Sequence, residues 1–122
     1  MKRVLLVDDH VLFRQCLACV LDRSNPGFEV VGQAGSLAEV RASKEAGGID
    51  IALVDLGLPD GDGVELVREL REANPPVPVL VLTTVFDPAW HARAREAGAE
   101  GVLTTAASLQ EIFEASKRVA AS

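Results

Sequence analysis

Residues 4–10, Val-Leu-Leu-Val-Asp-Asp-His, and residues 51–57, Ile-Ala-Leu-Val-Asp-Leu-Gly, each place an acidic side chain directly after a short apolar run. Similar apolar runs recur at 28–31, 77–82 and 102–103, and segments with helical spacing of apolar residues separate them. Near-continuous Val, Ile and Leu indicates strands that are covered on both faces, as in the parallel sheets of α/β proteins. We therefore predict an α/β fold in which five parallel strands alternate with helices.

Length and composition favour one compact domain over residues 1–122. The chain has 122 residues and 48% hydrophobic content, which is enough for a single core and too little for two ordinary domains. Its 12 Lys and Arg against 18 Asp and Glu give a net charge of -6, which repels a nucleic-acid backbone. No stretch reaches membrane-spanning length, and the amino-terminal apolar run is too short for a signal peptide. We expect a cytoplasmic protein whose domain contacts neither DNA nor a membrane.

The helical segments carry start signals and apolar stripes. Three pairs have the spacing of a capping box, in which a side-chain oxygen and an acid satisfy the first amides of a helix; they are Ser36 with Glu39, Asp62 with Glu65, and Ser108 with Glu111. Two stripes have the helical period. They consist of Leu12, Phe13, Cys16, Leu17, Val20 and Leu21 in the first helix, and of Leu109, Ile112, Phe113 and Ser116 in the last.

Cys16 and Cys19 have the spacing of a redox or metal-binding pair. Redox pairs of this kind open a helix after a strand, whereas these residues fall in the middle of a predicted helix. The chain has no further cysteine for a tetrahedral zinc site. We therefore expect both side chains to pack in or near the core of a protein from a reducing compartment.

Polar residues at the ends of the predicted strands form a candidate site. Asp8 and Asp9 follow the first strand, Asp55 follows the third, and Thr83 follows the fourth. In open parallel sheets, ligands bind beyond the carboxyl ends of the strands, where the strand order reverses. Carboxylates gathered there repel one another unless a cation is bound, and oxygen-only ligands favour Mg²⁺. Taken singly, each acid is also consistent with a helix-capping loop.

Two segments, 4–10 and 55–63, resemble the signature segments of response-regulator receiver domains. The second reads Asp55-Leu-Gly-Leu-Pro-Asp-Gly-Asp-Gly63, and the resemblance extends over nearly the whole chain. It implies a flavodoxin-like fold of βα units around a five-stranded parallel sheet in the order 2-1-3-4-5. It also implies the receiver domain of a bacterial two-component system, a phosphoprotein that is not itself an enzyme.

The same resemblance assigns roles to individual residues. It implies that a histidine kinase phosphorylates Asp55, and that Thr83 binds an oxygen of the phosphoryl group. It further implies that Mg²⁺ is held by the carboxylates of Asp8, Asp9 and Asp55. The backbone carbonyl of Gly57 completes the implied set of protein ligands.

The lysine that receiver domains usually have at the end of the fifth strand is missing. The matching segment is Gly101-Val-Leu-Thr-Thr105, which puts Thr105 at the lysine position. Phosphorylation adds about 1.5 to 2 negative charges, and threonine offers no compensating charge. His10 and Arg14 are candidate replacement cations, with solvation as the alternative for both. Two hypotheses stay open: Asp55 is phosphorylated and switches weakly, or the domain is a phosphorylation-independent module for protein interaction or dimerisation.

Other positions carry less information. Val102 stands where the family often has an aromatic switch residue, so we expect no aromatic switching. Trp90 lies in the predicted fourth helix and is either an interface anchor or a half-buried cover of the sheet edge. Asp60 and Asp62 lie beyond Pro59 in the loop that enters the next helix, where we expect structural roles.

The Asp8-Asp9-His10 opening and the last helix are most similar to NarL/FixJ-type regulators, which usually carry a carboxyl-terminal helix-turn-helix. This similarity implies transcription control through a DNA-binding output domain outside this chain, with a homodimer as a further expectation; a free-standing signalling module is the alternative.

Haloacid-dehalogenase-like phosphatases are a rival class, with Asp-x-Asp at the first strand. Here the two acids are adjacent and the candidate nucleophile is on the third strand, so we expect no phosphoester turnover.

Overall fold

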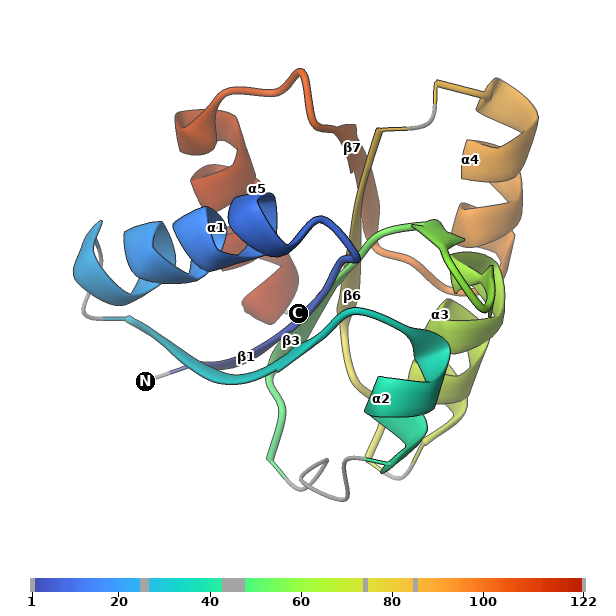
Figure 1. Cartoon of the computed structure of the whole chain (residues 1–122), viewed down its shortest axis with the longest axis horizontal. Coiled ribbons are helices and arrows are strands. Elements are labelled where there is room, and N and C mark those ends of the chain that lie inside the picture. Colours follow the sequence, from blue (N-terminus) through green and yellow to red (C-terminus); the bar gives the residue numbers. More distant parts are fainter. Residues whose placement is uncertain (1, 25–26, 43–47, 74, 85, 122) are drawn as a thin grey trace.

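One parallel sheet organises the chain, with helices on both of its faces (Figure 1). The computed structural model describes residues 2–24, 27–42, 48–73, 75–84 and 86–121. Five strands pair in the order β2-β1-β3-β6-β7, in which β6 and β7 are the fourth and fifth strands of this sheet along the chain. All pairs within the sheet are parallel. The predicted fold class and strand order are confirmed.

Strands and helices alternate along the chain as the apolar runs predict. The strands of the sheet are β1 (Lys2–Val7), β2 (Phe28–Ala34), β3 (Ile51–Val54), β6 (Val79–Thr83) and β7 (Gly101–Thr104). The helices are α1 (Val11–Ser24), α2 (Leu37–Ala42), α3 (Gly63–Glu72), α4 (Pro88–Glu96) and α5 (Leu109–Ala120). None of the described helices has the length and apolar character needed to cross a membrane.

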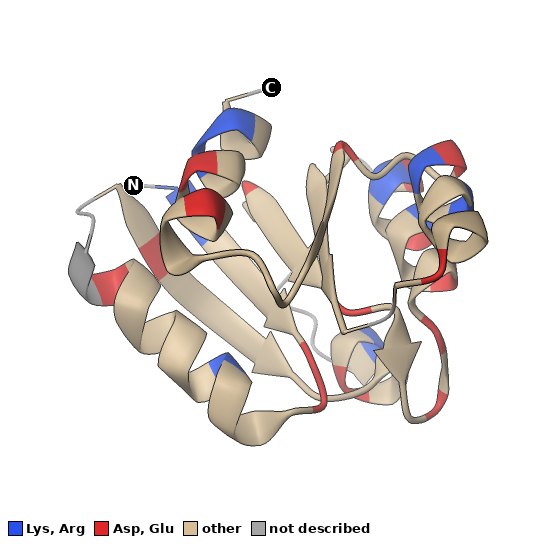
Figure 2. Cartoon of the chain, turned by 90° about the horizontal axis from the view of Figure 1, so that it is seen from above, with Lys and Arg blue, Asp and Glu red and all other residues tan. Residues whose placement is uncertain are grey.

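Alternate side chains of the central strands enter two separate cores. In β3, Ile51 and Leu53 belong to one core, whereas Ala52 and Val54 belong to the other. Helices α1 and α5 cover the first core, and α2, α3 and α4 cover the second (Figure 1). This double coverage explains why the strands are apolar at consecutive positions. Charged side chains lie mainly on the helices and the connecting loops (Figure 2).

A small antiparallel hairpin follows β3, and the apolar pattern does not predict it. Its strands are β4 (Gly57–Leu58) and β5 (Gly61–Asp62). Asp60 lies at its tip, where the carboxylate accepts hydrogen bonds from the amides of Ala38 (2.9 Å) and Leu37 (2.8 Å). These bonds lower the pKa of Asp60. Asp60 therefore caps α2 from a distant part of the chain, which is the structural role expected for it.

The predicted capping residues lie at the helix starts. Ser108 and Glu111 form a complete capping box at α5. Asp62 caps α3 by accepting a hydrogen bond from a first-turn amide. Before α2, the hydroxyl of Ser36 accepts a hydrogen bond from the amide of Glu39 (3.1 Å). Local side-chain chemistry thus determines where these helices begin.

The outward face of α1 differs from the prediction. Leu17 packs into the core, but Leu12 is 76% exposed, and Cys16 and Cys19 are exposed free thiols. The expectation that both cysteines pack in or near the core is therefore wrong. In α5, Leu109 is likewise 52% exposed. The apolar residues of each helix occupy a wider part of its surface than the sheet covers. The periodicity of apolar residues alone therefore does not identify the buried face.

Gly63 lies close to the backbone of Asp55 and Leu56, so a substitution at this position tests the packing around β3. A Cβ atom at this position would lie 2.4 Å from the carbonyl oxygen of Asp55 and 2.6 Å from the Cα atom of Leu56. Because both contacts are with backbone, Gly63→Ala requires the chain to shift. We expect this variant to lose about 1–3 kcal/mol of the free energy of unfolding, measured by urea denaturation with circular dichroism.

Gly57→Ala is the matched control for this measurement. A Cβ atom at Gly57 would have no neighbour within 4 Å. We expect the free energy of unfolding of this control, measured in EDTA, to stay within about 1 kcal/mol of the wild-type value. An equal loss of stability in both variants would contradict the close packing at Gly63.

Candidate functional site

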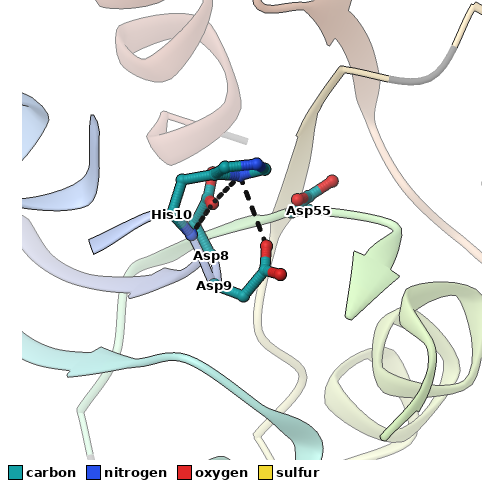
Figure 3. Close-up of side chains that lie close together, drawn as sticks. All are labelled: Asp8, Asp9, His10 and Asp55. Carbon is teal, nitrogen blue, oxygen red and sulfur yellow. Dashed lines mark hydrogen bonds and ion pairs between the residues drawn. The ribbon is translucent and has the colours of Figure 1, made fainter. Parts of the chain in front are cut away.

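Three carboxylates meet at the carboxyl ends of β1 and β3 (Figure 3). The amide of Asp55 donates a hydrogen bond to the carbonyl of Val7 (2.8 Å), which holds the end of β3 beside the end of β1. Asp8 is buried and Asp55 is only 2% exposed, whereas Asp9 has 34% of its side chain exposed. The convergence of Asp8, Asp9 and Asp55 that the strand pattern predicts is observed.

The donor atoms of this group suit a small divalent cation. One ligand atom from each of Asp8, Asp9, His10 and Asp55 lies within 4.8 Å of the others. Octahedral Mg²⁺ binds its ligands at about 2.0–2.1 Å, which separates opposite ligands by about 4.2 Å, so a single ion fits with small side-chain movements. Carboxylate oxygens are also the ligands that Mg²⁺ prefers in proteins. The three acids therefore fit the ion that the resemblance implies.

Burial makes the charged form of Asp55 unfavourable. Desolvation raises the pKa of Asp55, and the negative charges of Asp8 and Asp9 raise it further. The amide of Gly57 (3.2 Å) and the hydroxyl of Thr83 oppose this shift by donating hydrogen bonds to the carboxylate. The pKa nevertheless lies above its ordinary value. A cation bound beside Asp55 would offset this unfavourable desolvation and repulsion.

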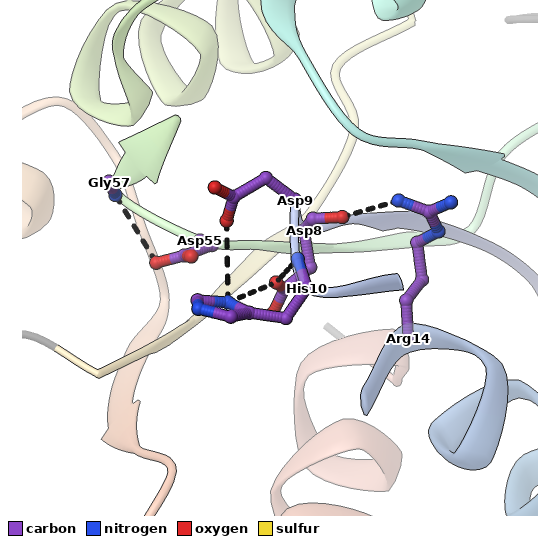
Figure 4. Close-up of polar contacts among 6 residues, drawn as sticks. All are labelled: Asp8, Asp9, His10, Arg14, Asp55 and Gly57. Carbon is purple, nitrogen blue, oxygen red and sulfur yellow. Dashed lines mark hydrogen bonds and ion pairs between the residues drawn. The ribbon is translucent and has the colours of Figure 1, made fainter. Parts of the chain in front are cut away.

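Thr83 and Gly57 contact the Asp55 carboxylate from two different strand ends. Thr83 is fully buried at the end of β6, and its hydroxyl bonds to the carboxylate. Gly57 begins the hairpin and donates its amide to Oδ1 of Asp55 (Figure 4). The carbonyl of Gly57 as a metal ligand stays a prediction. The proximity of Thr83 to Asp55, in contrast, is observed.

Thr105 follows β7 at the position where the resemblance expects a lysine. Its amide donates a hydrogen bond to the carbonyl of Thr83 (2.9 Å), so it lies beside the strand end that contacts Asp55. A threonine side chain brings no positive charge to this place. Val102, the residue at the expected switch position, pairs with Val81 in the sheet and is half-buried.

Of the two candidate replacement cations, His10 reaches the carboxylates and Arg14 turns elsewhere. The Nδ1 atom of His10 lies 3.0 Å from Oδ1 of Asp8 and 3.3 Å from Oδ1 of Asp9 (Figure 3). The hydrogen bond with Asp8 and the charges of Asp8, Asp9 and Asp55 raise the pKa of His10. The guanidinium of Arg14 instead donates to the backbone carbonyl of Asp8 (Figure 4). Arg14 therefore supports the loop, and only His10 joins the acidic group.

Trp90 is half-buried and connects α4 to the start of α3. Its indole N–H donates a hydrogen bond to Oδ1 of Asp62 (2.9 Å), and Arg93 donates to Oδ2 (2.9 Å). Burial opposes the charge on Asp62, but hydrogen bonds from Val64, Trp90 and Arg93 lower its pKa overall. Trp90 packs against the core as one of its two alternatives predicts. The sequence does not predict the hydrogen bond between Trp90 and Asp62, because these residues are 28 positions apart and belong to no common motif.

Comparison with known proteins agrees with this geometry. The sequence profile described as "Response regulator receiver domain" matches residues 4–117. This chain belongs to the response regulator receiver domain family. The DNA-binding transcriptional activator DevR/DosR of Mycobacterium tuberculosis is 39% identical to it over 121 residues, which cover 99% of this chain and 55% of that protein. The receiver domain is close to those of NarL/LuxR-type regulators, as its first and last segments predict.

Solved receiver domains share the fold of this one. The crystal structure of a two-component response regulator of the LuxR family from Aurantimonas sp. SI85-9A1 has a TM-score of 0.88 at 32% identity, covering 99% of this chain and 86% of that one. A CheY-like receiver domain protein from Methanospirillum hungatei JF-1 has a TM-score of 0.88 at 25% identity, covering 99% and 94%. The present chain spans about half the length of the curated relatives it matches.

Removal of the Asp55 charge is expected to stabilise the receiver domain in the absence of divalent cations. The pKa of Asp55 is higher in the folded state than its ordinary value of 3.8, so protonated Asp55 favours folding. This contribution to the free energy of unfolding is fully present below pH 3.8 and is lost as the pH rises through the pKa of the folded state. The charged carboxylate is therefore less favourable in the folded state than in the unfolded state. We expect Asp55→Asn to raise the free energy of unfolding in EDTA at neutral pH, measured by urea denaturation, and to flatten its decline above pH 3.8.

Asp87→Asn removes the same charge from an exposed site and serves as the control. Asp87 caps α4, and asparagine caps helices equally well. We expect this control to change the free energy of unfolding by less than about 0.5 kcal/mol. The electrostatic account of the pocket fails if Asp55→Asn is less stable than the wild type under these conditions.

Proposed function

We propose that residues 1–122 form the receiver domain of a two-component response regulator, and that a histidine kinase phosphorylates this domain on Asp55. The convergence of Asp8, Asp9 and Asp55 on an ion-sized space carries the proposal. It combines a nucleophile with a place for the cation that phosphoryl transfer requires. The hydroxyl of Thr83 on the Asp55 carboxylate further supports it, because the same hydroxyl is in position to contact a phosphoryl group.

In the proposed reaction, a carboxylate oxygen of Asp55 attacks the phosphorus atom of a phosphohistidine. An O–P bond forms, the P–N bond breaks, and the leaving imidazole takes up a proton, so the product is an acyl phosphate on Asp55. Mg²⁺, held by Asp8, Asp9, Asp55 and the carbonyl of Gly57, would neutralise charge on the phosphoryl oxygens. Thr83 exchanges its hydrogen bond with the carboxylate for one with a phosphoryl oxygen. The domain acts as a switch without turnover of a substrate.

The output of this switch belongs, in our proposal, to another domain of the full-length protein. The match to DevR/DosR, a DNA-binding transcriptional activator, covers 55% of that relative. The net charge of -6 on the present chain is unfavourable for contact with DNA. We therefore propose that a separate output domain binds DNA in the cytoplasm, with phosphorylation controlling transcription through a homodimer.

Thr105 weakens the proposed switch. The phosphoryl group adds about 1.5 to 2 negative charges to a pocket that already contains Asp8 and Asp9. Thr105 lies beside Thr83 but contributes a hydroxyl without charge. The phosphorylated state is therefore less favoured than in a receiver domain that has lysine at this position.

Direct phosphorylation tests the assignment of Asp55. Incubation of the chain with acetyl phosphate and Mg²⁺ is expected to add one phosphoryl group, detected by intact mass spectrometry. Asp55→Asn should abolish this gain, and EDTA should abolish it in the wild type. Asp60→Asn, which changes an acid in the adjacent hairpin, should be modified like the wild type. A gain that survives Asp55→Asn, or no gain at saturating donor, contradicts the proposal.

Thr105→Lys tests the electrostatic role of the missing lysine. An ammonium group next to the modified pocket offsets part of the added charge, so we expect the ratio of phosphorylated to unmodified protein at a fixed donor concentration to rise about tenfold, equivalent to about 1.4 kcal/mol. Thr105→Gln lengthens the side chain without a charge and should stay near the wild-type ratio. Equal ratios for the Lys and Gln variants would show that charge is not what this position lacks.

A further inference from the structure

His10 adds a nitrogen atom to the acidic group at the ends of β1 and β3. Its Nδ1 atom lies 3.0 Å from Oδ1 of Asp8 and 3.3 Å from Oδ1 of Asp9, so the ring faces both carboxylates (Figure 3). The backbone amide of His10 also donates a hydrogen bond to Oδ1 of Asp8 (2.8 Å). Two contacts with one carboxylate hold the residue against the pocket, although 56% of its side chain is exposed.

These spacings match those of ligands around a single ion. Adjacent ligands of an octahedral ion at about 2.1 Å are about 3.0 Å apart, and opposite ligands are about 4.2 Å apart. Nδ1 of His10 has the adjacent spacing to Asp8 and a slightly larger one to Asp9. The set that includes Asp55 lies within 4.8 Å. One ion can therefore reach the imidazole and the carboxylates together.

The neighbouring cation does not compete with an ion for this space. The guanidinium of Arg14 donates to the backbone carbonyl of Asp8 and to the side-chain oxygen of Gln33 (3.2 Å for the second bond), and it points away from Asp55 (Figure 4). Thr105, at the lysine position, carries no charge. The imidazole of His10 is thus a basic group in direct contact with the acidic side chains of the pocket.

A mixed nitrogen and oxygen donor set changes which ion is preferred. Mg²⁺ is a hard cation that favours oxygen ligands and retains several waters. Imidazole nitrogen suits iron, nickel, copper and zinc ions, and the affinity of a given site for divalent first-row ions rises from Mn²⁺ toward Cu²⁺. Replacing a water on the ion by His10 therefore strengthens the binding of a transition ion more than that of Mg²⁺.

We propose that His10 is a direct ligand of the cation through Nδ1, together with Asp8, Asp9 and Asp55, and that the pocket consequently selects first-row transition ions over Mg²⁺. The proposal rests on the metal pocket of the proposed function and adds the residue that determines its ion selectivity. On binding, the ion displaces the proton that Nδ1 shares with Asp8, this proton passes to solvent, and the remaining ring proton is on Nε2. The phosphorylation chemistry at Asp55 is unchanged.

Mn²⁺ is the probe for the test, because its electron spin reports a coordinated nitrogen directly. Pulsed electron paramagnetic resonance of the chain with Mn²⁺ should show ¹⁴N coupling of a bound imidazole. His10→Ala should lose this coupling. His91→Ala, which changes the other histidine of the chain in α4, should retain it.

Binding constants provide the second measurement. Mn²⁺ affinity, titrated from the signal of the free ion, should fall on the order of tenfold in His10→Ala, whereas Mg²⁺ affinity, measured by competition, should change much less. His10→Asn offers an amide oxygen in place of the nitrogen and should likewise lose the Mn²⁺ preference. Urea denaturation in EDTA verifies that each variant folds.

Each outcome bears on one proposal. The absence of ¹⁴N coupling in the wild type overturns the role of His10. Tighter binding of both ions by His10→Ala does so too, because it shows that the ring competes with the cation. If these results occur while Asp55 is still phosphorylated, only this inference fails. If the wild type binds neither Mn²⁺ nor Mg²⁺, the proposed function fails with it.

Discussion

The parallel pairing of β1 with β3 brings like charges together, and the chemistry of the pocket follows from that constraint. The hydrogen bond from the Asp55 amide to Val7 places a buried carboxylate beside Asp8 and Asp9. Desolvation and mutual repulsion then raise the pKa of Asp55, so the fold holds an unfavourable charge at a defined point. Thr105, which stands where the family resemblance expects a lysine, brings no positive charge to this point. A bound ion would compensate for the repulsion, and His10 lies at the rim of the same pocket.

Sequence reasoning reached the sheet and the acids because both depend on short-range patterns. Consecutive apolar residues reveal strands covered on both faces, and β3 has the predicted bounds Ile51–Val54. Once the strand order is known, residues that follow adjacent strands must meet at one edge. The positions of Asp8, Asp9, Asp55 and Thr83 follow from that rule. Their roles in phosphorylation rest on the family resemblance and on the proposed experiments.

The features that sequence reasoning missed depend on contacts between distant segments. Periodicity shows that α1 is amphipathic, but the face that meets the sheet is set by packing, which leaves Cys16 and Leu12 outside. The bond from Trp90 to Asp62 joins two helices without any sequence signature. His10 and Arg14 were equivalent candidates because side-chain direction is decided by local hydrogen bonds, and those bonds send only His10 into the pocket.

Two aspartates of the β4–β5 hairpin, Asp60 and Asp62, connect this short segment to three helices. Asp60 holds the first amides of α2, while Asp62 holds the start of α3 and, through Trp90, the first turn of α4. The same segment begins with the amide that donates to Asp55. A displacement of the hairpin therefore cannot stay local, since it loosens helix anchorage at several points at once. The same short connection therefore links the acidic pocket to the starts of α2, α3 and α4, which together cover one face of the sheet.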